Sequence, residues 1–324
     1  MKLITILKKL AVACMFATNI INASNTNTID NIHFLIPGGI GGGWDSTARS
    51  VGEVLLKAKL ANSVSFENMS GYGGGKALSY LIETLKKQNN TMMINSTPIV
   101  IKSLQNYFPQ SFRDLTLIAS IITDYQVLAV REDSSLKSWN DILIKFKKNP
   151  RKLKIGGGSS RGSLDHIVSA QIFKAAGYDP KLVKYISYDA GGKAFNALIS
   201  GEIDVLSTGL GEVLEKYRLG KVKIIAVTSL EPIKGIEDIP TFKSLGVDMS
   251  FANWRGFFAA PGMSEKQVDK FANILKEMYD TTQWKEVRKK NGWSDLYQPK
   301  KEFRQFLEEQ EKSISSLMKE LGFL

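Results

Sequence analysis

Glycine clusters are the features of this sequence with the most obvious chemical use. Three of them lie between a predicted strand and a predicted helix, at residues 37–45, 156–163 and 190–193, and a fourth lies at residues 71–75. Glycine lets the main chain approach a ligand closely and adopt positive φ. A helix that follows such a loop presents free N–H groups and the positive end of its dipole. Because the pattern recurs in different parts of the chain, it favours an anion site over simple tight turns.

The nucleotide-binding motifs that use glycine are incomplete here. Gly41 and Gly43 are followed by Ser46 where the third glycine of a dinucleotide-binding loop belongs, and Lys76 is followed by Ala77 where a P-loop needs serine or threonine. A site of main-chain donors without a P-loop lysine suits a carboxylate better than a triphosphate. The sequence therefore predicts a carboxylate site without a nucleotide cofactor.

One enzyme motif is present. Residues 158–162 read G-x-S-x-G between a strand and a helix, which is the context of the nucleophile in α/β-hydrolases. That fold needs an acid and then a histidine after the serine, but the chain has only His33 and His166, and His166 lies six residues beyond Ser160 in the helix that the motif begins. This spacing argues against a hydrolase, and two histidines so placed offer no metal-ligand pattern. We predict that the chain is not an enzyme and binds no metal.

The glycine clusters punctuate a regular alternation of elements. Such alternation indicates an α/β fold of mostly parallel sheets flanked by helices. Apolar residues at helical spacing predict helices over residues 44–59, 268–278 and 303–321. The predicted strands are residues 32–36, 92–94, 115–122, 126–130, 153–155, 183–186, 203–206 and 222–227.

At 324 residues the chain is long enough for two lobes. Residues 121–130 form an extended run with a polar interruption, which is typical of a strand that crosses between lobes, and residues 253–262 indicate a return crossing. The sequence therefore predicts a discontinuous first lobe, residues 24–122 with 255–324, and a continuous second lobe, residues 123–254.

The first residues have the layout of a secretory signal peptide. Lys2, Lys8 and Lys9 precede an apolar run over residues 10–21, and small residues follow it. The run is too short to span a bilayer, which takes about 20 residues. We predict cleavage after Ala23, so that residues 1–23 are removed and the protein works in the periplasm. Cys14, the one cysteine, leaves with this segment, so the mature chain forms no disulfide.

Composition is otherwise that of an ordinary globular protein, with 43% hydrophobic and 23% charged residues. The formal net charge is +11, and removal of the three signal-peptide lysines leaves +8. An exported chain without a dense basic tract is not expected to bind nucleic acid. Its field favours small anions.

The residues in combination resemble the periplasmic receptors of tripartite tricarboxylate transporters, also called Bug-type binding proteins, over essentially the whole mature chain. The Gly-Trp-Asp form of the first loop is similar to the tricarboxylate-receptor branch of that family. The resemblance rests on residues 41–45 with Ala48-Arg49, 156–159 with Asp165-His166, Gly191-Gly192, 209–212, 239–241, 253–256, 291–293 and Leu321-Gly322.

This resemblance implies a type II periplasmic-binding-protein fold in which the interlobe cleft holds a carboxylate by main-chain donors of both lobes. Asp45 is unsuited to contact an anion directly, so we expect it to cap the helix or fix the loop. Carried over by position, the implied binding residues are Gly41, Gly42, Gly43, Trp44 and Asp45 in the first lobe, and Ser159, Ser160, Gly162, Ser163, Gly191, Gly192 and Thr208 in the second.

Arg161 departs from the family pattern, where a small residue is usual. Its guanidinium could form a two-pronged contact with a second carboxylate, or it could point to solvent. The sequence leaves both roles open, and with them the identity of the ligand.

The resemblance implies a monomeric receptor that needs no cofactor. It would capture a small, citrate-like di- or tricarboxylate and deliver it to the large and small membrane subunits of a tripartite tricarboxylate transporter. A receptor that reports its ligand to a membrane sensor kinase is the alternative that sequence cannot separate from it. An exported serine hydrolase is the third reading, and the missing histidine weighs against it.

The signal peptide gives a first testable prediction. Mass spectrometry of the periplasmic protein should find a chain that starts near Ser24, because the small residues after the apolar run suit signal peptidase. A mature chain that begins at a lipid-modified Cys14 would contradict this and would tether the protein to the membrane.

Overall fold

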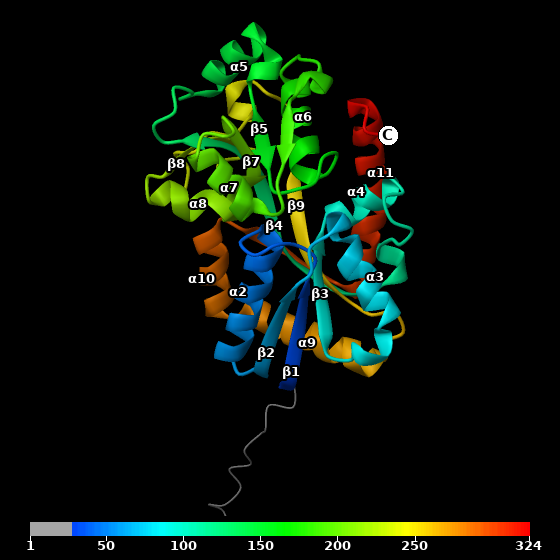
Figure 1. Ribbon diagram of the computed structural model, residues 1–324. Coiled ribbons are helices and arrows are strands. Elements are labelled where there is room, and N and C mark those ends of the chain that lie inside the picture. The colour runs from blue at the N-terminus through cyan, green and yellow to red at the C-terminus, as the bar shows by residue number, and fades with distance from the viewer. Residues whose placement is uncertain (1–27) are drawn as a thin grey trace, which may run out of the picture.

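The computed structural model describes residues 28–324. The predicted signal peptide and Cys14 lie outside these residues. The described chain forms two halves, one above the other, with the long strand β4 (Thr116–Arg131) running through both (Figure 1). Within the described part, no helix is both long and apolar enough to cross a membrane.

The lower half is built on the first strands of the chain. Strand β1 pairs in parallel with β2 on one side and β3 on the other, and α2 follows β1 directly after a glycine loop. The elements of this half are β1 (Ile29–Ile36), α2 (Gly43–Lys57), β2 (Ala61–Asn68), α3 (Gly75–Glu83), β3 (Thr91–Ser96), α4 (Pro98–Leu104), α9 (Glu265–Asp280), α10 (Thr282–Asn291) and β10 (Ser294–Pro299).

The upper half continues the chain beyond β4. Strand β5 pairs in parallel with both β6 and β7, and a helix follows each of these three strands. Its elements are α5 (Trp139–Lys148), β5 (Ile155–Gly157), α6 (Leu164–Ala175), β6 (Tyr185–Ser187), α7 (Gly191–Ile199), β7 (Val205–Gly209), α8 (Leu210–Arg218) and β8 (Val222–Val227). Short 3₁₀ segments of the two halves are residues 72–74, 85–87, 112–114, 150–152, 180–182 and 243–245.

Two strands connect the halves. The first part of β4 pairs antiparallel with β9 (Ala252–Ala259) and β10, and from Gln126 onward β4 pairs antiparallel with β7 and β8. Strand β9 also pairs with β3, which places it between β3 and β4 in the order β2-β1-β3-β9-β4-β7-β5-β6. Residues 115–122 and 126–130, separate strands in the sequence pattern, are one extended strand. The lobe boundaries at residues 122/123 and 254/255 stay a prediction.

The predicted α/β class, with helices flanking the sheet, is confirmed. The sheet is mixed: its parallel pairs are those made by strand–helix–strand units, and every antiparallel pair among the described strands involves β4 or β9. Strands β2 and β10 were missed by the sequence pattern because both lie at edges and carry exposed polar residues.

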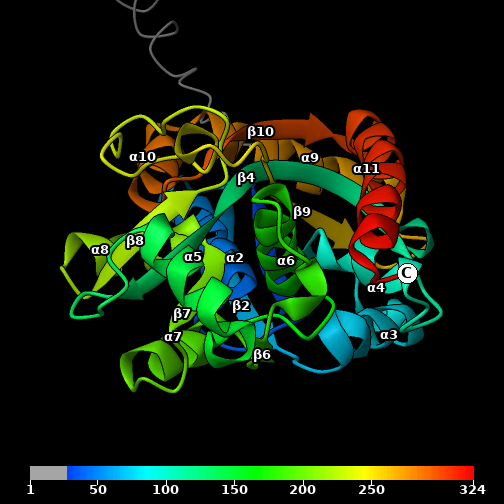
Figure 2. The ribbon, with the colours of Figure 1, turned by 90° about the horizontal axis from the view of Figure 1, so that it is seen from above.

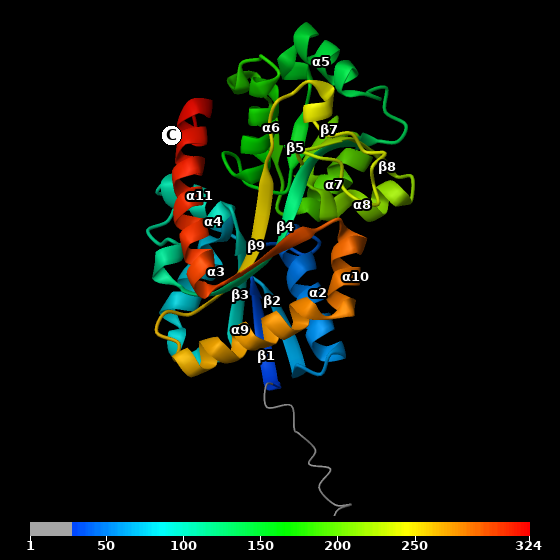
Figure 3. The same ribbon diagram turned by 180° about the vertical axis from the view of Figure 1, so that it is seen from behind.

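The last helix, α11 (Lys300–Leu321), braces both halves. It runs along the outside of the molecule from the lower half to the upper half (Figure 3), and from above it lies at the edge opposite α8 (Figure 2). At its beginning, the fully buried Phe303 packs against Trp254 and Phe258, with ring centroids 5.2 and 5.4 Å away. At its end, Glu320 pairs with Lys174 of α6. The helix therefore fixes the connecting strand β9 to the upper half.

The contact at Phe303 predicts a large stability effect. Phe303→Ala should lower the free energy of unfolding by about 3–5 kcal/mol, because a buried aromatic ring is replaced by a cavity. Chemical denaturation measures this value. Lys312→Ala, an exposed position on the same helix, is the control and should change stability by no more than about 0.5 kcal/mol. Equal stability of the two variants would contradict the packing role of Phe303.

Candidate functional site

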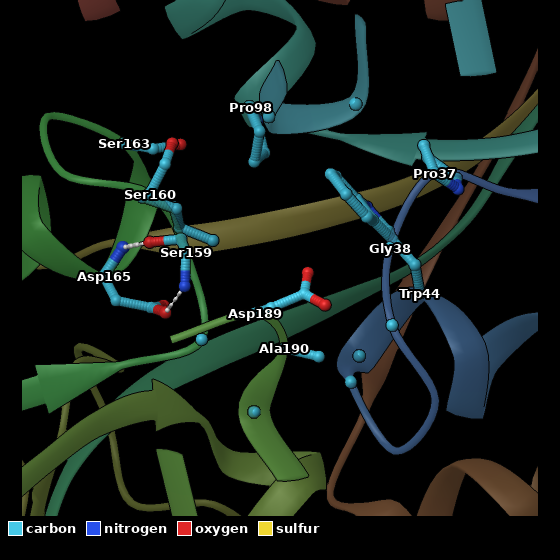
Figure 4. Close-up of a pocket in the computed structure, with 18 of the residues that line it drawn as sticks. Pro37, Gly38, Trp44, Pro98, Ser159, Ser160, Ser163, Asp165, Asp189 and Ala190 are labelled. Atoms are coloured by element: carbon cyan, nitrogen blue, oxygen red, sulfur yellow. Dashed lines mark hydrogen bonds between the residues drawn. The ribbon is translucent and has the colours of Figure 1, made fainter. Parts of the chain in front are cut away.

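A pocket of about 350 Å³ lies between the two halves. Figure 4 shows its walls: Pro37, Gly38 and Trp44 of the lower half face Ser159, Ser160 and Asp189 of the upper half. The lining includes the first residues of α2, α6 and α7, which come from both halves. The N–H groups of a helix's first turn have no partner within the helix. The pocket is thus surrounded by main-chain donors and by the positive ends of helix dipoles.

The loop before α2 is held by the acid of the helix's first turn. Asp45 Oδ2 accepts a hydrogen bond from the Gly41 N–H at 3.0 Å, and its Oδ1 pairs with Arg49 Nε at 2.8 Å. The adjacent Trp44 donates from Nε1 to Ser96 Oγ at 2.9 Å, which fixes its ring against the pocket wall. Asp45 therefore fixes the loop, which is one of the two roles expected for it.

The loop before α6 uses the same device. Ser159 N donates to Asp165 Oδ2 at 3.0 Å, and Asp165 N donates back to Ser159 Oγ at 2.9 Å (Figure 4). At the next residue, His166 Nδ1 accepts a hydrogen bond from Gly162 N at 3.0 Å. Burial lowers the pKa of His166 to about 4, so the ring is neutral near pH 7 and can accept this bond. The second loop is thus as firmly fixed as the first.

The loop before α7 brings two main chains into contact. The Ala190 N–H donates to Gly158 O at 3.2 Å, and a side chain at Gly158 would collide with Gly191 N. Ala190 itself has φ 84° and ψ 155°, a region that is essentially restricted to glycine. Strained backbone of this kind persists only where surrounding contacts impose it. Here the contacts hold the start of α7 against the loop before α6.

The floor of the pocket is charged. Arg255 of β9 lines it with a side chain that is 4% exposed, and its Nη2 lies 3.6 Å from Asp124 Oδ2 on β4. Glu212 of α8 lines it as well; the residue is half-buried, but its Oε2 is buried and has no hydrogen-bond partner among the described residues. A side chain at Gly43 would meet the Arg255 guanidinium, and one at Gly191 would meet the Glu212 carboxyl. The charged groups therefore lie directly behind the glycines of α2 and α7.

Burial perturbs the acids of this cluster. It raises the pKa of Asp124 and of Asp165 to about 6, against the attraction of Arg255. Burial, with repulsion from Asp165, raises the pKa of Glu212 to about 8. Glu212 is thus mainly protonated at neutral pH and offers an O–H donor on the pocket floor.

The structure separates the sequence-predicted site residues into two groups. Among the described residues, those that do not line the pocket lie behind the loops, as Asp45 and Thr208 do, or are exposed, as Arg161 is. Contact of any of them with a ligand stays a prediction. The predicted residues that line the pocket are Gly42, Gly43, Trp44, Ser159, Ser160, Ser163 and Gly191. The predicted residues that do not line it are Gly41, Asp45, Arg161, Gly162, Gly192 and Thr208.

Several lining residues were not predicted. Arg255 and Asn253 belong to the motif at 253–256, and Glu212 belongs to the motif at 209–212. Both motifs supported the family resemblance, but neither indicated that these residues line the pocket. The loop at 71–74 also lines the pocket; it was recognised as a glycine cluster, yet nothing in its pattern placed it beside the other loops. Their shared position arises only from folding.

The geometry around Ser160 does not support the hydrolase hypothesis. Ser160 Oγ is buried and has no hydrogen-bond partner in the described part of the chain. His166, the only histidine near it in sequence, uses Nδ1 to accept from Gly162. No histidine is thus bonded to the candidate nucleophile.

Comparison with known proteins agrees with this architecture. The model of the tripartite tricarboxylate transporter family receptor matches residues 47–323. The structure of the periplasmic binding protein BugD superposes with a TM-score of 0.82 at 21% identity, covering 91% of this chain and 98% of that one. MatC of Rhodopseudomonas palustris with bound malate gives 0.78 at 18% identity (89% and 99% covered), and Rpa4515 of R. palustris with adipate gives 0.81 at 19% (90% and 97%). The resemblance drawn from the sequence is confirmed at the level of the family and the fold.

The buried acid Glu212 predicts a pH-dependent stability. Its pKa in the folded chain, about 8, lies above its ordinary value of 4.5, so the folded state holds a proton that the unfolded state releases. The free energy of unfolding should therefore fall as pH rises toward 8, by at most about 1.4 kcal/mol per pH unit. In the folded chain Asp124 and Asp165 titrate near pH 6, and in the unfolded chain His166 titrates near its ordinary value of 6.5, so the range 7.5–8.5 isolates Glu212.

Urea denaturation across that range tests the assignment. Glu212→Gln should flatten the decline, whereas Glu215→Gln, an exposed position on the same helix, should leave it as in the unaltered chain. An unaltered slope in Glu212→Gln would show that another group carries the proton.

Proposed function

Because this chain belongs to the tripartite tricarboxylate transporter family of receptors, a family of solute-binding proteins, we propose that it captures a small di- or tricarboxylate, citrate-like in size and charge. It does so in the periplasm and delivers the ligand to the large and small membrane subunits of such a transporter. The observation that carries the proposal is the convergence of the N-termini of α2, α6 and α7 on one pocket between the two halves.

The donor set suits a carboxylate. Main-chain N–H groups at helix starts bind anions without needing a positively charged side chain, and the glycines allow a ligand oxygen to come close to them. A cavity of about 350 Å³ is at the small end of ligand pockets, which matches a ligand of a few carbon atoms. The malate and adipate bound by the two R. palustris proteins of the same fold are dicarboxylates, which supports this ligand class.

Capture and release of the ligand follow from the fact that the hydrogen-bond donors of the pocket are divided between the two halves. One wall of the pocket belongs to the lower half and the other to the upper half, so a ligand that contacts both links them. A ligand shifts the molecule toward the conformation that it binds more tightly. The transporter subunits would then recognise the ligand-closed form, and separation of the halves would release the carboxylate.

A thermal-shift series on the mature chain tests the ligand class. Succinate and citrate at about 100 times their Kd should each stabilise the folded state by about 2.7 kcal/mol, since only the folded chain binds them. Glucose, of similar size and without charge, is the control and should give no shift. Absence of a shift with every di- and tricarboxylate tried would overturn the proposal.

Two adjacent glycines provide a matched test of the pocket. A methyl group at Gly191 would collide with Glu212 Oε2, whereas one at Gly192 would have Ile40 O at 3.4 Å as its nearest neighbour, an ordinary contact. Gly191→Ala should therefore displace the Glu212 carboxyl or the start of α7, both of which line the pocket, and weaken carboxylate binding at least tenfold. Gly192→Ala should bind nearly as the unaltered chain does. Calorimetric titration measures both. Equal affinities would place the ligand elsewhere.

A further inference from the structure

If the proposed function holds, a ligand with two or more carboxylates needs a place for its second negative charge. Arg161, the arginine that the sequence pointed to, is exposed and does not line the pocket. Arg255 is the only positively charged residue among the described residues that line it. The structure therefore makes Arg255, and not Arg161, the candidate for contact with a second carboxylate.

Arg255 has unused hydrogen-bonding capacity beside the pocket that it lines. Its Nε and Nη1 are buried and have no hydrogen-bond partner among the described residues. Its third nitrogen, Nη2, reaches only Asp124 Oδ2, at 3.6 Å. Buried donors without partners cost free energy, so folded proteins rarely keep them except where a water, an ion or a ligand satisfies them. Two free donors on one guanidinium match the two oxygens of a carboxylate.

The position of Arg255 is rigid. Its main chain lies in the middle of the sheet, where it pairs with Ile122 of β4 on one side and with Ser96 of β3 on the other. Its guanidinium packs against Gly43, the first residue of α2. The cation therefore adds to the positive end of the helix dipole, and both act on the same end of the pocket.

The neighbouring acids do not occupy the Nε and Nη1 donors of Arg255. Among the described residues, Asp124 of β4 is the only direct ion-pair partner of Arg255, and the distance from Arg255 Nη2 to Asp124 Oδ2 is longer than a hydrogen bond. Asp165 of α6 already accepts from Ser159, and Glu212 of α8 has its pKa raised to about 8 by burial, so at neutral pH it carries a proton. The remaining groups that face Glu212, Thr208 of β7 and Tyr185 of β6, are uncharged near pH 7, since the pKa of Tyr185 is raised well above its ordinary value.

We propose that Arg255 is the residue that makes this pocket select polycarboxylates over monocarboxylates. Main-chain donors of the glycine loops take one carboxylate, and the Arg255 guanidinium, which lines the floor of the pocket, takes a second. A purely structural arginine, present only to balance Asp124, would affect folding without distinguishing ligands by their number of carboxylates.

Calorimetric titration with three probes tests this assignment. Butyrate and succinate have the same four-carbon chain and one or two carboxylates, and tricarballylate has three. The unaltered chain should bind succinate and tricarballylate at least tenfold more tightly than butyrate. Arg255→Gln should remove most of that preference, because it should weaken succinate and tricarballylate binding much more than butyrate binding. Arg255→Lys should restore the preference in part, because lysine supplies charge without the two-pronged geometry, and Arg161→Gln should keep it whole.

The outcomes separate this inference from the proposed function. If the unaltered chain binds none of the three probes, the proposed function fails. If it binds butyrate as tightly as succinate, the proposed function survives and the role of Arg255 is overturned without any variant, even if Arg255→Gln does not fold. An equal loss for all three probes in a folded Arg255→Gln or Arg255→Lys protein, or a loss of preference in Arg161→Gln, would also overturn it.

Discussion

The close approach of main chain to main chain at the glycine loops is the constraint on which this structure depends. Gly158 and Gly191 touch where any side chain would separate them, and the strained Ala190 is held by the same contact. This approach brings helix starts from both halves to one pocket. Had the loops carried ordinary side chains, the helices could still form, but their free N–H groups would point at space too wide for one small anion to bridge.

Both halves prepare their donors in the same way. In each, an aspartate in the first turn of the helix accepts an N–H group from the loop that precedes it: Asp45 from Gly41, and Asp165 from Ser159. The acid consumes one donor and thereby fixes the orientation of the others. A rigid set of donors costs less entropy when it binds a ligand than a loop that must first be ordered. An aspartate beside the proposed anion site is thus compatible with anion binding, because it holds the loop.

The charged floor joins the elements that the sequence keeps apart. Arg255 lies on β9, Asp124 on β4 and Glu212 on α8, so the cluster ties the connecting strands to the upper half at the pocket itself. Burial of such groups costs free energy that ion pairing only partly returns. The raised pKa values of Asp124, Asp165 and Glu212 express that cost. A binding role for the floor would explain why the cluster is not replaced by well-packed apolar residues.

The sequence by itself determined the local features of this protein. Strand–helix alternation, the glycine loops before α2, α6 and α7, and the loop-fixing role of Asp45 all depend on residues within a few positions of one another, and periodicity and capping report such contacts directly. Motif residues such as Gly42, Ser159 and Gly191, which line the pocket, were implied by the resemblance to the family. Edge strands β2 and β10 were not predicted, because their exposed, polar residues do not form the run of apolar residues that marks a strand.

Only the tertiary structure decided which charged residues face the pocket. Arg161 sits inside a glycine motif and is exposed, whereas Arg255 lies more than 90 positions further along and enters the floor through the pairing of β9 with β3 and β4. Glu212 reaches the same place from α8. Contacts of this kind are set by strand order and by the packing of one half on the other, which no window of neighbouring residues records. The sequence could therefore predict the donors of the loops, but the cation that completes the pocket emerges only when the two halves come together.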